Sequence, residues 1–243
     1  MLVVDNVTKR FGGLMALKKV SFKLKDKSIT GIIGPNGAGK TTLFNCISGV
    51  YRCDEGKIFF KGIDITNLNP EDICHLGIAR TYQIPRPFLN LTGLENVLVG
   101  ILYGRKQKIS FNEARKEALH ILDFVGLREK SDRPVSSYTL ADRKMLEIAR
   151  ALASNPELIL LDEVISGLTP AETLRAMEII RKIRDELGVT VLWIEHVMRA
   201  LFAIVEHVIV LNFGEKIAEG TPKEVANDEK VIEAYLGKKY IIH

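Results

Sequence analysis

The chain has 243 residues, of which 47% are hydrophobic, so it can bury a substantial core as one large domain or as a domain with a subdomain. Its formal charge of +4 comes from 34 basic and 30 acidic residues spread along the chain, and this mixed surface argues against nucleic acid as a partner. Three cysteines without C-x-x-C spacing argue against a disulfide framework.

The first residues, Met1 to Asp5, lack the basic and apolar regions of a signal peptide. No apolar run approaches the ~20 residues that span a bilayer. If the protein functions at a membrane, we therefore expect it to do so from outside the bilayer, through a partner.

Residues 1–62 have the alternation of strands. Val20 to Leu24 places apolar side chains on one face, and Gly56 to Gly62 reads as a strand bounded by glycines. These patterns predict an antiparallel sheet on the flank of a glycine-rich segment. Phe11, near the start, is a candidate to stack on an adenine ring, and a core position is the equal alternative.

The glycine-rich segment is a complete G-x-x-x-x-G-K-[ST] phosphate-binding loop. It reads Gly34-Pro35-Asn36-Gly37-Ala38-Gly39-Lys40-Thr41-Thr42. Its glycines let backbone N–H groups curl around phosphate oxygens, Lys40 is expected to reach the β- and γ-phosphates, and the Thr41 hydroxyl to join Mg²⁺. A buried strand at 28–33 and a helix opening near Thr42 are expected on either side, which places a positive helix end under the phosphates.

Residues of about 84–150 are expected to be mainly helical. Ser110 and Glu113 form a capping box that opens a helix ending near Gly126, and a second helix follows with apolar residues from Met145 to Leu152. Gln83 stands where strand character gives way to helix. Its amide could contact Mg²⁺ or an attacking water and release on hydrolysis, although a solvated loop glutamine is the favoured interpretation of this residue taken by itself.

From 157 onward, strands and helices alternate. The apolar strand 158–161 ends in Asp162 and Glu163, which we interpret as a Mg²⁺-supporting acid and a water-polarising acid; a surface acidic pair is the alternative. After a helix over 170–187, the strand 189–194 leads to His196, a candidate contact for the γ-phosphate. A last hairpin turns on Phe213-Gly214.

Together these residues resemble the ATP-binding subunit of ABC transporters over nearly the whole chain. The resemblance identifies Phe11 as the adenine-stacking aromatic, 34–42 as Walker A, Gln83 as the Q-loop glutamine, Asp162 and Glu163 as the Walker B acids, and His196 as the switch histidine. The segments 77–83, 91–98, 220–222 and 231–237 are similar to the branched-chain amino acid uptake group. Urea-uptake and lipopolysaccharide-export ATPases have similar sequences in these segments, so urea and lipopolysaccharide are alternative cargoes.

The resemblance implies an α/β fold: a phosphate-loop NTPase core with a mostly parallel sheet, an antiparallel β subdomain and a helical subdomain. One ABC ATPase domain would cover 1–243, with 1–83 and 151–243 as the nucleotide-binding core and 84–150 as the helical subdomain. It also implies ATP and Mg²⁺ as ligands, permease subunits as membrane partners, a substrate-binding protein as an indirect partner, and a peripheral place on the cytoplasmic face of the cell membrane. Segment 84–104 is the expected docking site for the permease, and a buried loop is the alternative.

The resemblance also implies that two subunits pair head to tail. The Walker A loop of each subunit then faces the signature motif of its partner, typically Leu-Ser-Gly-Gly-Gln. Here that position holds Tyr138-Thr139-Leu140-Ala141-Asp142. Thr139 keeps a hydroxyl for phosphate and can cap the next helix, whereas Leu140 and Ala141 hinder close backbone approach. Asp142 is unfavourable near an anion, and Arg143 and Lys144 are expected to offset it.

Two smaller departures are Val164 in place of the usual proline and a D-loop, 166–170, without its usual aspartate. We expect a heterodimer with a second ATPase subunit, and a homodimer stays possible. Two other functions are alternatives: an ATP-binding subunit with little hydrolysis, and a soluble ABC ATPase of DNA repair or translation. One Walker A in 243 residues leaves no room for the tandem cassettes or long insertion of the latter.

Overall fold

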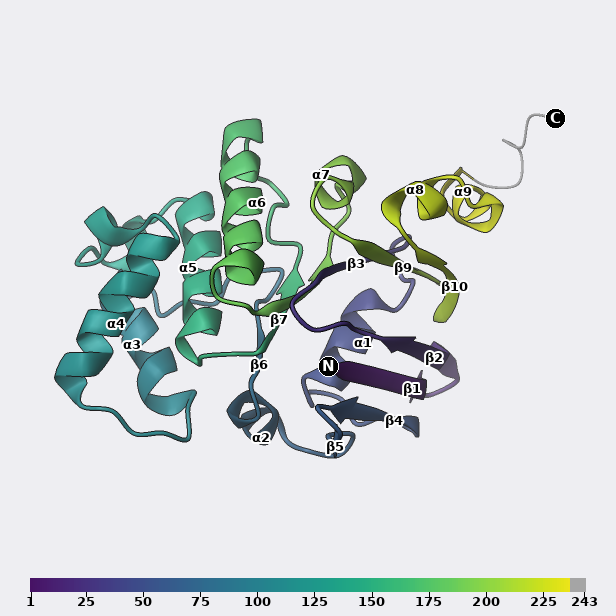
Figure 1. Cartoon of the computed structure of the whole chain (residues 1–243), viewed down its shortest axis with the longest axis horizontal. Coiled ribbons are helices and arrows are strands. Elements are labelled where there is room, and N and C mark those ends of the chain that lie inside the picture. Colours follow the sequence, from purple (N-terminus) through teal and green to yellow (C-terminus); the bar gives the residue numbers. More distant parts are fainter. Residues whose placement is uncertain (237–243) are drawn as a thin grey trace. The chain divides into compact units, whose positions relative to one another are not determined.

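The computed structural model describes residues 1–236, and the chain divides into two compact units. The first unit combines residues 1–70 with the described residues from 192 onward, and the second is residues 71–191. Figure 1 shows the first unit in purple and yellow-green and the second mainly in teal and green. Gly237, the end of the C-terminal segment singled out above, lies outside the described residues.

The first unit contains the antiparallel sheet that the alternation predicts. Its strands β1 (Leu2–Phe11), β2 (Leu14–Lys23), β4 (Glu55–Phe60) and β5 (Ile63–Asp64) run in the order β2-β1-β4-β5, and every pair is antiparallel. Alternate side chains such as Val4, Val20 and Ile58 are buried, because successive residues of a strand point to opposite faces.

A second set of strands in this unit leads into the phosphate loop. Strand β3 (Ile29–Ile33) is buried at every position and pairs in parallel with β9 (His207–Asn212). Strand β8 (Thr190–Ile194), whose last three residues belong to this unit, neighbours β3 in the sheet order. Strand β10 (Glu215–Gly220) returns antiparallel to β9 through the predicted turn at Phe213 and Gly214. Both turn residues have positive φ (47° and 82°), as tight hairpins require.

Short helices complete the first unit. Helix α1 (Lys40–Ile47) follows the loop, and α7 (Met198–Phe202), α8 (Pro222–Ala226) and α9 (Glu229–Leu236) accompany the later strands.

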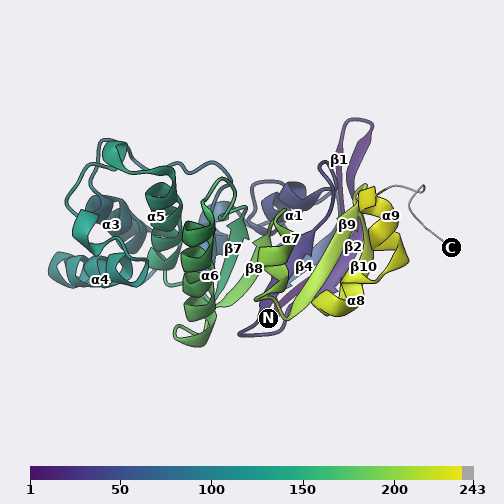
Figure 2. The same ribbon diagram turned by 90° about the horizontal axis from the view of Figure 1, so that it is seen from above.

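The second unit pairs β6 (Ile78–Arg80) in parallel with β7 (Leu158–Asp162), after α2 (Pro70–His75). Its helices are α3 (Gly93–Tyr103), α4 (Phe111–Phe124), α5 (Leu140–Ala153) and α6 (Pro170–Asp185), with short 3₁₀ turns at Arg128–Lys130 and Val135–Ser137. Helices α3, α4 and α5 pack against one another and stand together in both ribbon views (Figures 1 and 2).

The helix starts follow the predicted caps. Ser110 opens α4 with a capping box, and Gly126 follows its end with φ 76°. Helix α6 ends at Asp185, two residues before the predicted end, and Gly188 follows with φ 66°. The predicted helical segment 84–150 lies inside the second unit, but its separation as a subdomain stays a prediction. Within residues 1–236, no helix has the length and apolar character needed to cross a bilayer.

Candidate functional site

The phosphate loop joins β3 to α1 in the strand–loop–helix order that the sequence predicts. Two glycines make this path sterically possible. A Cβ on Gly34 would lie 2.1 Å from the carbonyl oxygen of Leu211, and a Cβ on Gly39 would lie 2.5 Å from that of Ala16. Gly39 also has φ 100°, which an L side chain rarely adopts. The loop is therefore pressed against neighbouring backbone at both ends.

The N-terminus of α1 differs from the N-termini of α3, α4, α5 and α6, because no side chain of its cap accepts a hydrogen bond from its backbone N–H groups. Gly39 caps it without a side-chain hydrogen bond, and its first turn carries no acidic residue. By contrast, α3, α4, α5 and α6 each begin with a capping box whose acid accepts a backbone N–H. The positive end of α1 is thus available to an anion, as a phosphate site needs.

Lys40 lies with its ammonium inside this loop. Its Nζ donates hydrogen bonds to the carbonyl oxygens of Gly34 at 2.7 Å and Pro35 at 3.0 Å, and the residue is 6% exposed. Asn36, Gly37 and Thr41 are exposed around it, Thr42 is half-buried, and Ala38 is buried. The Lys40 ammonium and the exposed residues Asn36, Gly37 and Thr41 therefore lie in the loop and the first turn of α1.

Phe11 ends β1 with 43% of its surface exposed, so the structure does not place it in the core. Tyr51 meets its ring edge-on, with centroids 5.2 Å apart, and Lys9 lies over the ring at 5.4 Å. A ring fixed by two neighbours and open to solvent is suited to stacking on a planar base.

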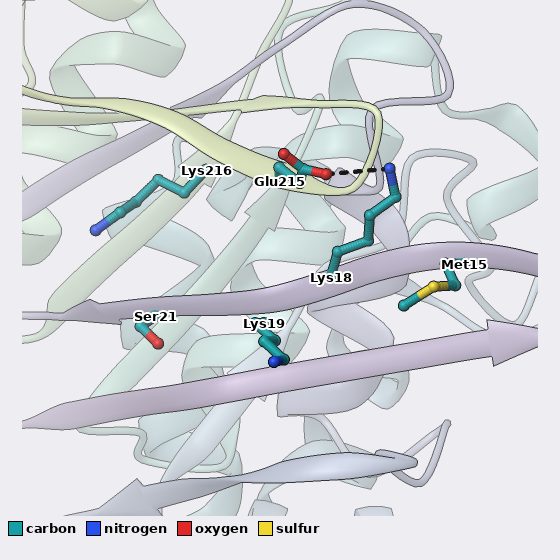
Figure 3. Close-up of a pocket in the computed structure, with 6 residues that line it drawn as sticks. All are labelled: Met15, Lys18, Lys19, Ser21, Glu215 and Lys216. Carbon is teal, nitrogen blue, oxygen red and sulfur yellow. Dashed lines mark hydrogen bonds and ion pairs between the residues drawn. The ribbon is translucent and has the colours of Figure 1, made fainter.

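A basic groove of about 420 Å³ lies on β2 and β10 of the same unit (Figure 3). Lys18, Lys19 and Lys216 line it, and Lys18 pairs with Glu215 at 3.2 Å. Its strands also support the phosphate loop, because the Lys18 N–H donates to the Gly214 carbonyl and the Gly214 N–H donates to that of Ala38.

In the second unit, the predicted acidic pair ends strand β7. Asp162 and Glu163 are 1% and 8% exposed, and Arg80 of β6 pairs with the Asp162 carboxylate at 2.9 Å. The exposed Gln83 donates from Nε2 to Oε2 of Glu163 at 2.7 Å. The acids are therefore held by buried contacts, which excludes the alternative of a solvated surface pair and ties the predicted Q-loop glutamine to the second acid.

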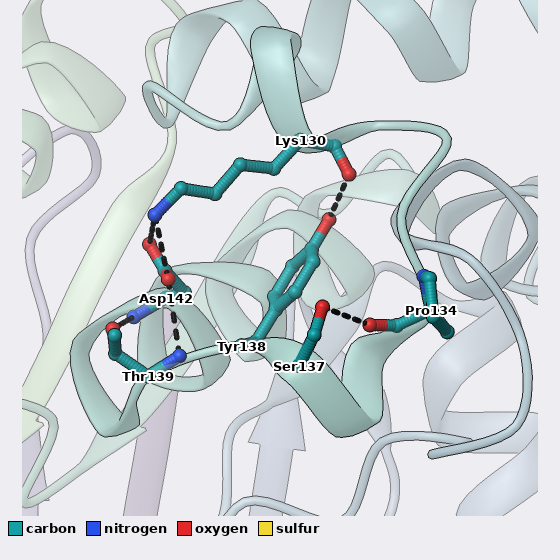
Figure 4. A network of polar contacts seen from close by, with 6 residues as sticks. All are labelled: Lys130, Pro134, Ser137, Tyr138, Thr139 and Asp142. Atoms are coloured by element: carbon teal, nitrogen blue, oxygen red, sulfur yellow. Dashed lines mark hydrogen bonds and ion pairs between the residues drawn. The ribbon is translucent and has the colours of Figure 1, made fainter.

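The signature position opens helix α5. Thr139 is its N-cap: the Asp142 N–H donates to the Thr139 hydroxyl at 3.2 Å, and the Thr139 N–H donates to the Asp142 carboxylate at 3.1 Å. Figure 4 shows Lys130 reaching across to the same carboxylate, with Nζ–O distances of 2.6 and 2.7 Å. Tyr138 braces Lys130 by donating to its carbonyl oxygen at 2.6 Å. The predicted cap is confirmed.

The neutralising partner of Asp142 differs from the prediction. Arg143 donates to the Ser136 carbonyl at 3.0 Å and Lys144 to the Glu163 carbonyl at 2.7 Å, so Lys130 supplies the positive charge instead. Side chains at i+1 and i+2 on a helix point away from residue i, and this geometry sends Arg143 and Lys144 elsewhere. Burial raises the pKa of Asp142, but the hydrogen bonds from Lys130 and Thr139 lower it more, and the net pKa lies below the ordinary value.

His196 follows β8 in the first unit, as the sequence predicts, and is exposed. Its backbone N–H donates to the carboxylate of the buried Glu195 at 3.1 Å. The backbone at this point is thereby held while the imidazole stays open to solvent.

An uncapped helix behind a phosphate loop and a buried acidic pair at a strand end define a phosphate-loop nucleotide-binding protein. The family model described as "ABC transporter" matches residues 17–166, and the model "Branched-chain amino acid ATP-binding cassette transporter" matches residues 215–241. The chain therefore belongs to the ABC transporter ATP-binding family. It is the ATP-binding and ATP-hydrolysing subunit of such a transporter.

Its relatives and solved neighbours extend over the whole chain. It is 38% identical to the high-affinity branched-chain amino acid transport ATP-binding protein LivG of Salmonella typhimurium, covering 98% of both chains, and 39% identical to the probable LivG of Archaeoglobus fulgidus, covering 98% of this chain and 95% of that one. The ADP conformation of the cassette MJ1267 superposes with a TM-score of 0.88 at 36% identity, over 98% of this chain and 99% of the other. A dimeric post-hydrolysis cassette, MJ0796 bound to ADP and Pi, gives 0.83 at 28% identity, over 91% and 99%.

The sequence predicts no role for Arg80 or Lys130, and it predicts a different role for Lys144 from the one that the structure shows. Arg80 holds Asp162, Lys130 holds Asp142, and Lys144 holds the backbone of Glu163. No spacing rule pairs residues that lie 82, 12 and 19 positions apart. The sequence contains only a weaker indication of these contacts: each of the three residues is a cation that lies near a predicted acidic motif, either along the sequence or on a neighbouring strand of the sheet.

Proposed function

We propose that this chain powers the import of branched-chain amino acids from the cytoplasmic face of the cell membrane. It would do so as one of two cassettes bound to permease subunits, with a substrate-binding protein delivering the cargo. The printed functions of the LivG relatives and the C-terminal family match support the cargo. The contact between Gln83 and Glu163 carries the proposed site, because it joins the segment after β6 to the acid that would receive a proton.

In this proposal, Glu163 accepts a proton from the water whose oxygen attacks the γ-phosphorus. The bond to the β-γ bridging oxygen breaks, and ADP takes the electron pair. Lys40 and backbone N–H groups of the loop from Gly34 to Thr42, Pro35 excepted, bind the phosphates. Phe11 stacks on adenine, and His196 orients the γ-phosphate. Thr139 would offer its hydroxyl to the nucleotide of the partner cassette.

The donor set fits Mg²⁺. Thr41 in the first unit and Asp162 and Gln83 in the second offer hydroxyl, carboxylate and amide oxygens, the hard donors that this ion prefers. When bound, Mg²⁺ would neutralise charge on the phosphate oxygens. Arg80 orients the Asp162 carboxylate through its 2.9 Å contact.

The decisive measurement for hydrolysis is Mg²⁺-ATP turnover by the purified chain, with Glu163→Gln as the comparison. We expect turnover to fall at least a hundredfold while ATP binding persists, since loss of a general base typically costs this much. Turnover that is unchanged in Glu163→Gln would remove Glu163 from the mechanism. Tight binding without turnover by the unmodified chain would favour a binding subunit with little hydrolysis, to which the altered signature also points.

We infer an asymmetric heterodimer. Leu140 is 49% exposed at the signature, so its side chain stands where a glycine would leave backbone accessible, whereas the phosphate loop and acidic pair are intact. Hydrolysis should then occur mainly on this chain's Lys40–Glu163 side. In the assembled pair, Glu163→Gln should abolish most turnover and the equivalent change in the partner cassette should matter less. The reverse result would contradict the inferred asymmetry.

The permease is proposed to dock on segment 84–104. Ile84 and Phe88, close to Gln83 in the sequence, are 72% and 48% exposed, and Tyr103 at the end of α3 is 76% exposed. Cysteine crosslinking from position 84 to the permease should succeed, and crosslinking from Phe111, which is 61% exposed on α4, should fail. Equal crosslinking from both positions would reject this site.

Cargo can be tested in cells that lack the chain. Uptake of radiolabelled leucine should be lost and then restored by the wild-type chain but not by Glu163→Gln. Retained leucine uptake with lost urea uptake, or with defective lipopolysaccharide export, would assign one of those alternative cargoes.

A further inference from the structure

Lys144 places a buried ammonium beside the backbone of Glu163. It lies on the second turn of α5 and is 5% exposed, and its Nζ donates a 2.7 Å hydrogen bond to the Glu163 carbonyl oxygen. Burial of a charged group is unfavourable unless strong hydrogen bonds compensate for the lost water. A lysine at this position is therefore held by a specific contact and not by apolar packing alone.

The residue that Lys144 contacts has an unusual backbone. Glu163 has φ 49°, in the left-handed region that residues other than glycine seldom occupy. The same carbonyl oxygen accepts the Ser166 N–H at 3.3 Å, and the carboxylate accepts the Gln83 amide at 2.7 Å. Glu163 is thus held at both ends, and rare backbone conformations persist only where surrounding contacts fix them.

We propose that Lys144 is a positioning residue for Glu163, and that it ties the aim of this acid to the position of helix α5. The proposal rests on the proposed role of Glu163 as the proton acceptor. Lys144 lies on α5, and its hydrogen bond goes to the backbone carbonyl of Glu163, so we assign it an action through Glu163 and not on the substrate.

The same helix carries Thr139 at its N-cap, five residues before Lys144 and thus ~7.5 Å along the axis. Thr139 is the group proposed to meet the nucleotide of the partner cassette. A rigid helix that touches one nucleotide at its start and holds the acid of the other site at its second turn provides a direct mechanical link between the two sites.

The test compares Lys144→Met with Lys144→Arg in the full chain, in the assembly where the wild type turns over ATP. Lys144→Met should lower kcat at least about tenfold while KM and the Kd for ATP change less than about threefold, the pattern of an interaction needed only in the transition state. Lys144→Arg keeps a donor and should restore kcat to within about threefold of wild type. Lys116→Met on the exposed side of α4 is the matched control and should leave both constants unchanged.

A second comparison separates positioning from general damage. If Lys144 acts through Glu163, adding Lys144→Met to Glu163→Gln should lower the residual rate less than about twofold, because groups that act as a unit are not additive. Independent, multiplicative losses would overturn the proposal, as would a raised KM with unchanged kcat. If Lys144→Met does not fold, Lys144→Gln, whose amide is shorter than the ammonium arm, takes its place in both comparisons.

The two levels of proposal fail differently. A Glu163→Gln variant with wild-type turnover would overturn the proposed catalytic site itself. A silent Lys144→Met variant beside an inactive Glu163→Gln variant would overturn only the positioning role.

Discussion

The side-chain amide of Gln83 donates a 2.7 Å hydrogen bond to Oε2 of Glu163, across 80 positions of sequence. The amide follows β6 and the carboxylate follows β7, two strands that pair in parallel, so their carboxyl ends meet at one edge. One oxygen of the proposed proton acceptor is therefore engaged by the residue proposed to sense the nucleotide. Movement of Gln83 would release that oxygen, and this gives the Q-loop a direct effect on the acid.

Gln83→Glu should make turnover depend strongly on pH. Two carboxylates at hydrogen-bond distance keep a shared proton to a higher pH than an isolated carboxylate does, because both cannot ionise together at low cost. Turnover at pH 7 should fall roughly tenfold and recover as the pH rises and the proton leaves. A pH–rate profile measures this, with Gln107→Glu on an exposed loop as the control. If Gln83→Glu lowers turnover equally at every pH, a proton shared with Glu163 does not explain the loss.

Asp142→Asn should destabilise the second unit by about 1 kcal/mol at pH 7, because it weakens a helix cap and the contact with Lys130. The pKa of Asp142 is lowered in the folded chain, so its stabilisation is complete above the unfolded pKa of about 3.9 and is lost as pH falls through the folded pKa. The difference from wild type should therefore shrink in acid. Urea unfolding at several pH values tests this, and Asp123→Asn on exposed α4 should cost less than about 0.5 kcal/mol. If the difference in the free energy of unfolding between Asp142→Asn and wild type does not change with pH, the negative charge of Asp142 is not the source of the stabilisation.

Gly39→Ala should lower both stability and ATP affinity. Its Cβ would lie 2.5 Å from the Ala16 carbonyl oxygen at φ 100°, so about 1–3 kcal/mol of stability should be lost. Gly13→Ala is the control, because a Cβ there meets nothing within 4 Å. Chemical denaturation and calorimetric ATP titration give the two quantities. Equal effects at both glycines would show that the close approach at Gly39 is unimportant.

Phe11→Ala should weaken ATP binding about fivefold, equivalent to ~1 kcal/mol, since stacking of aromatic rings contributes about this much. Stability should change little because the ring is 43% exposed. Phe111→Ala, with a ring 61% exposed on α4, should leave the affinity unchanged. Titration calorimetry with ATP distinguishes the two, and an unchanged affinity in Phe11→Ala would move the adenine contact elsewhere.

Local features were predictable because they depend on neighbours in the chain. The Ser110 cap, the turn at Phe213-Gly214 and the buried strand β3 all follow from residues within a few positions. The end of α6 was predicted two residues late, because helix ends are only weakly marked in a sequence. The expectation that Arg143 and Lys144 offset Asp142 was wrong for a similar reason: proximity in sequence does not set the direction of side chains on a helix.

The phosphate loop and the Asp162-Glu163 pair were recognisable from the sequence alone, because consecutive residues supply their functional groups. The backbone shape of these short segments is also set locally. The contacts that hold those groups were decided by tertiary structure. Lys130 reaches Asp142, Lys144 reaches the Glu163 carbonyl and Gln83 reaches its carboxylate only because helices and strand ends pack together within the second unit. Packing against many distant neighbours selects one partner for each side chain, and no single stretch of sequence contains that choice.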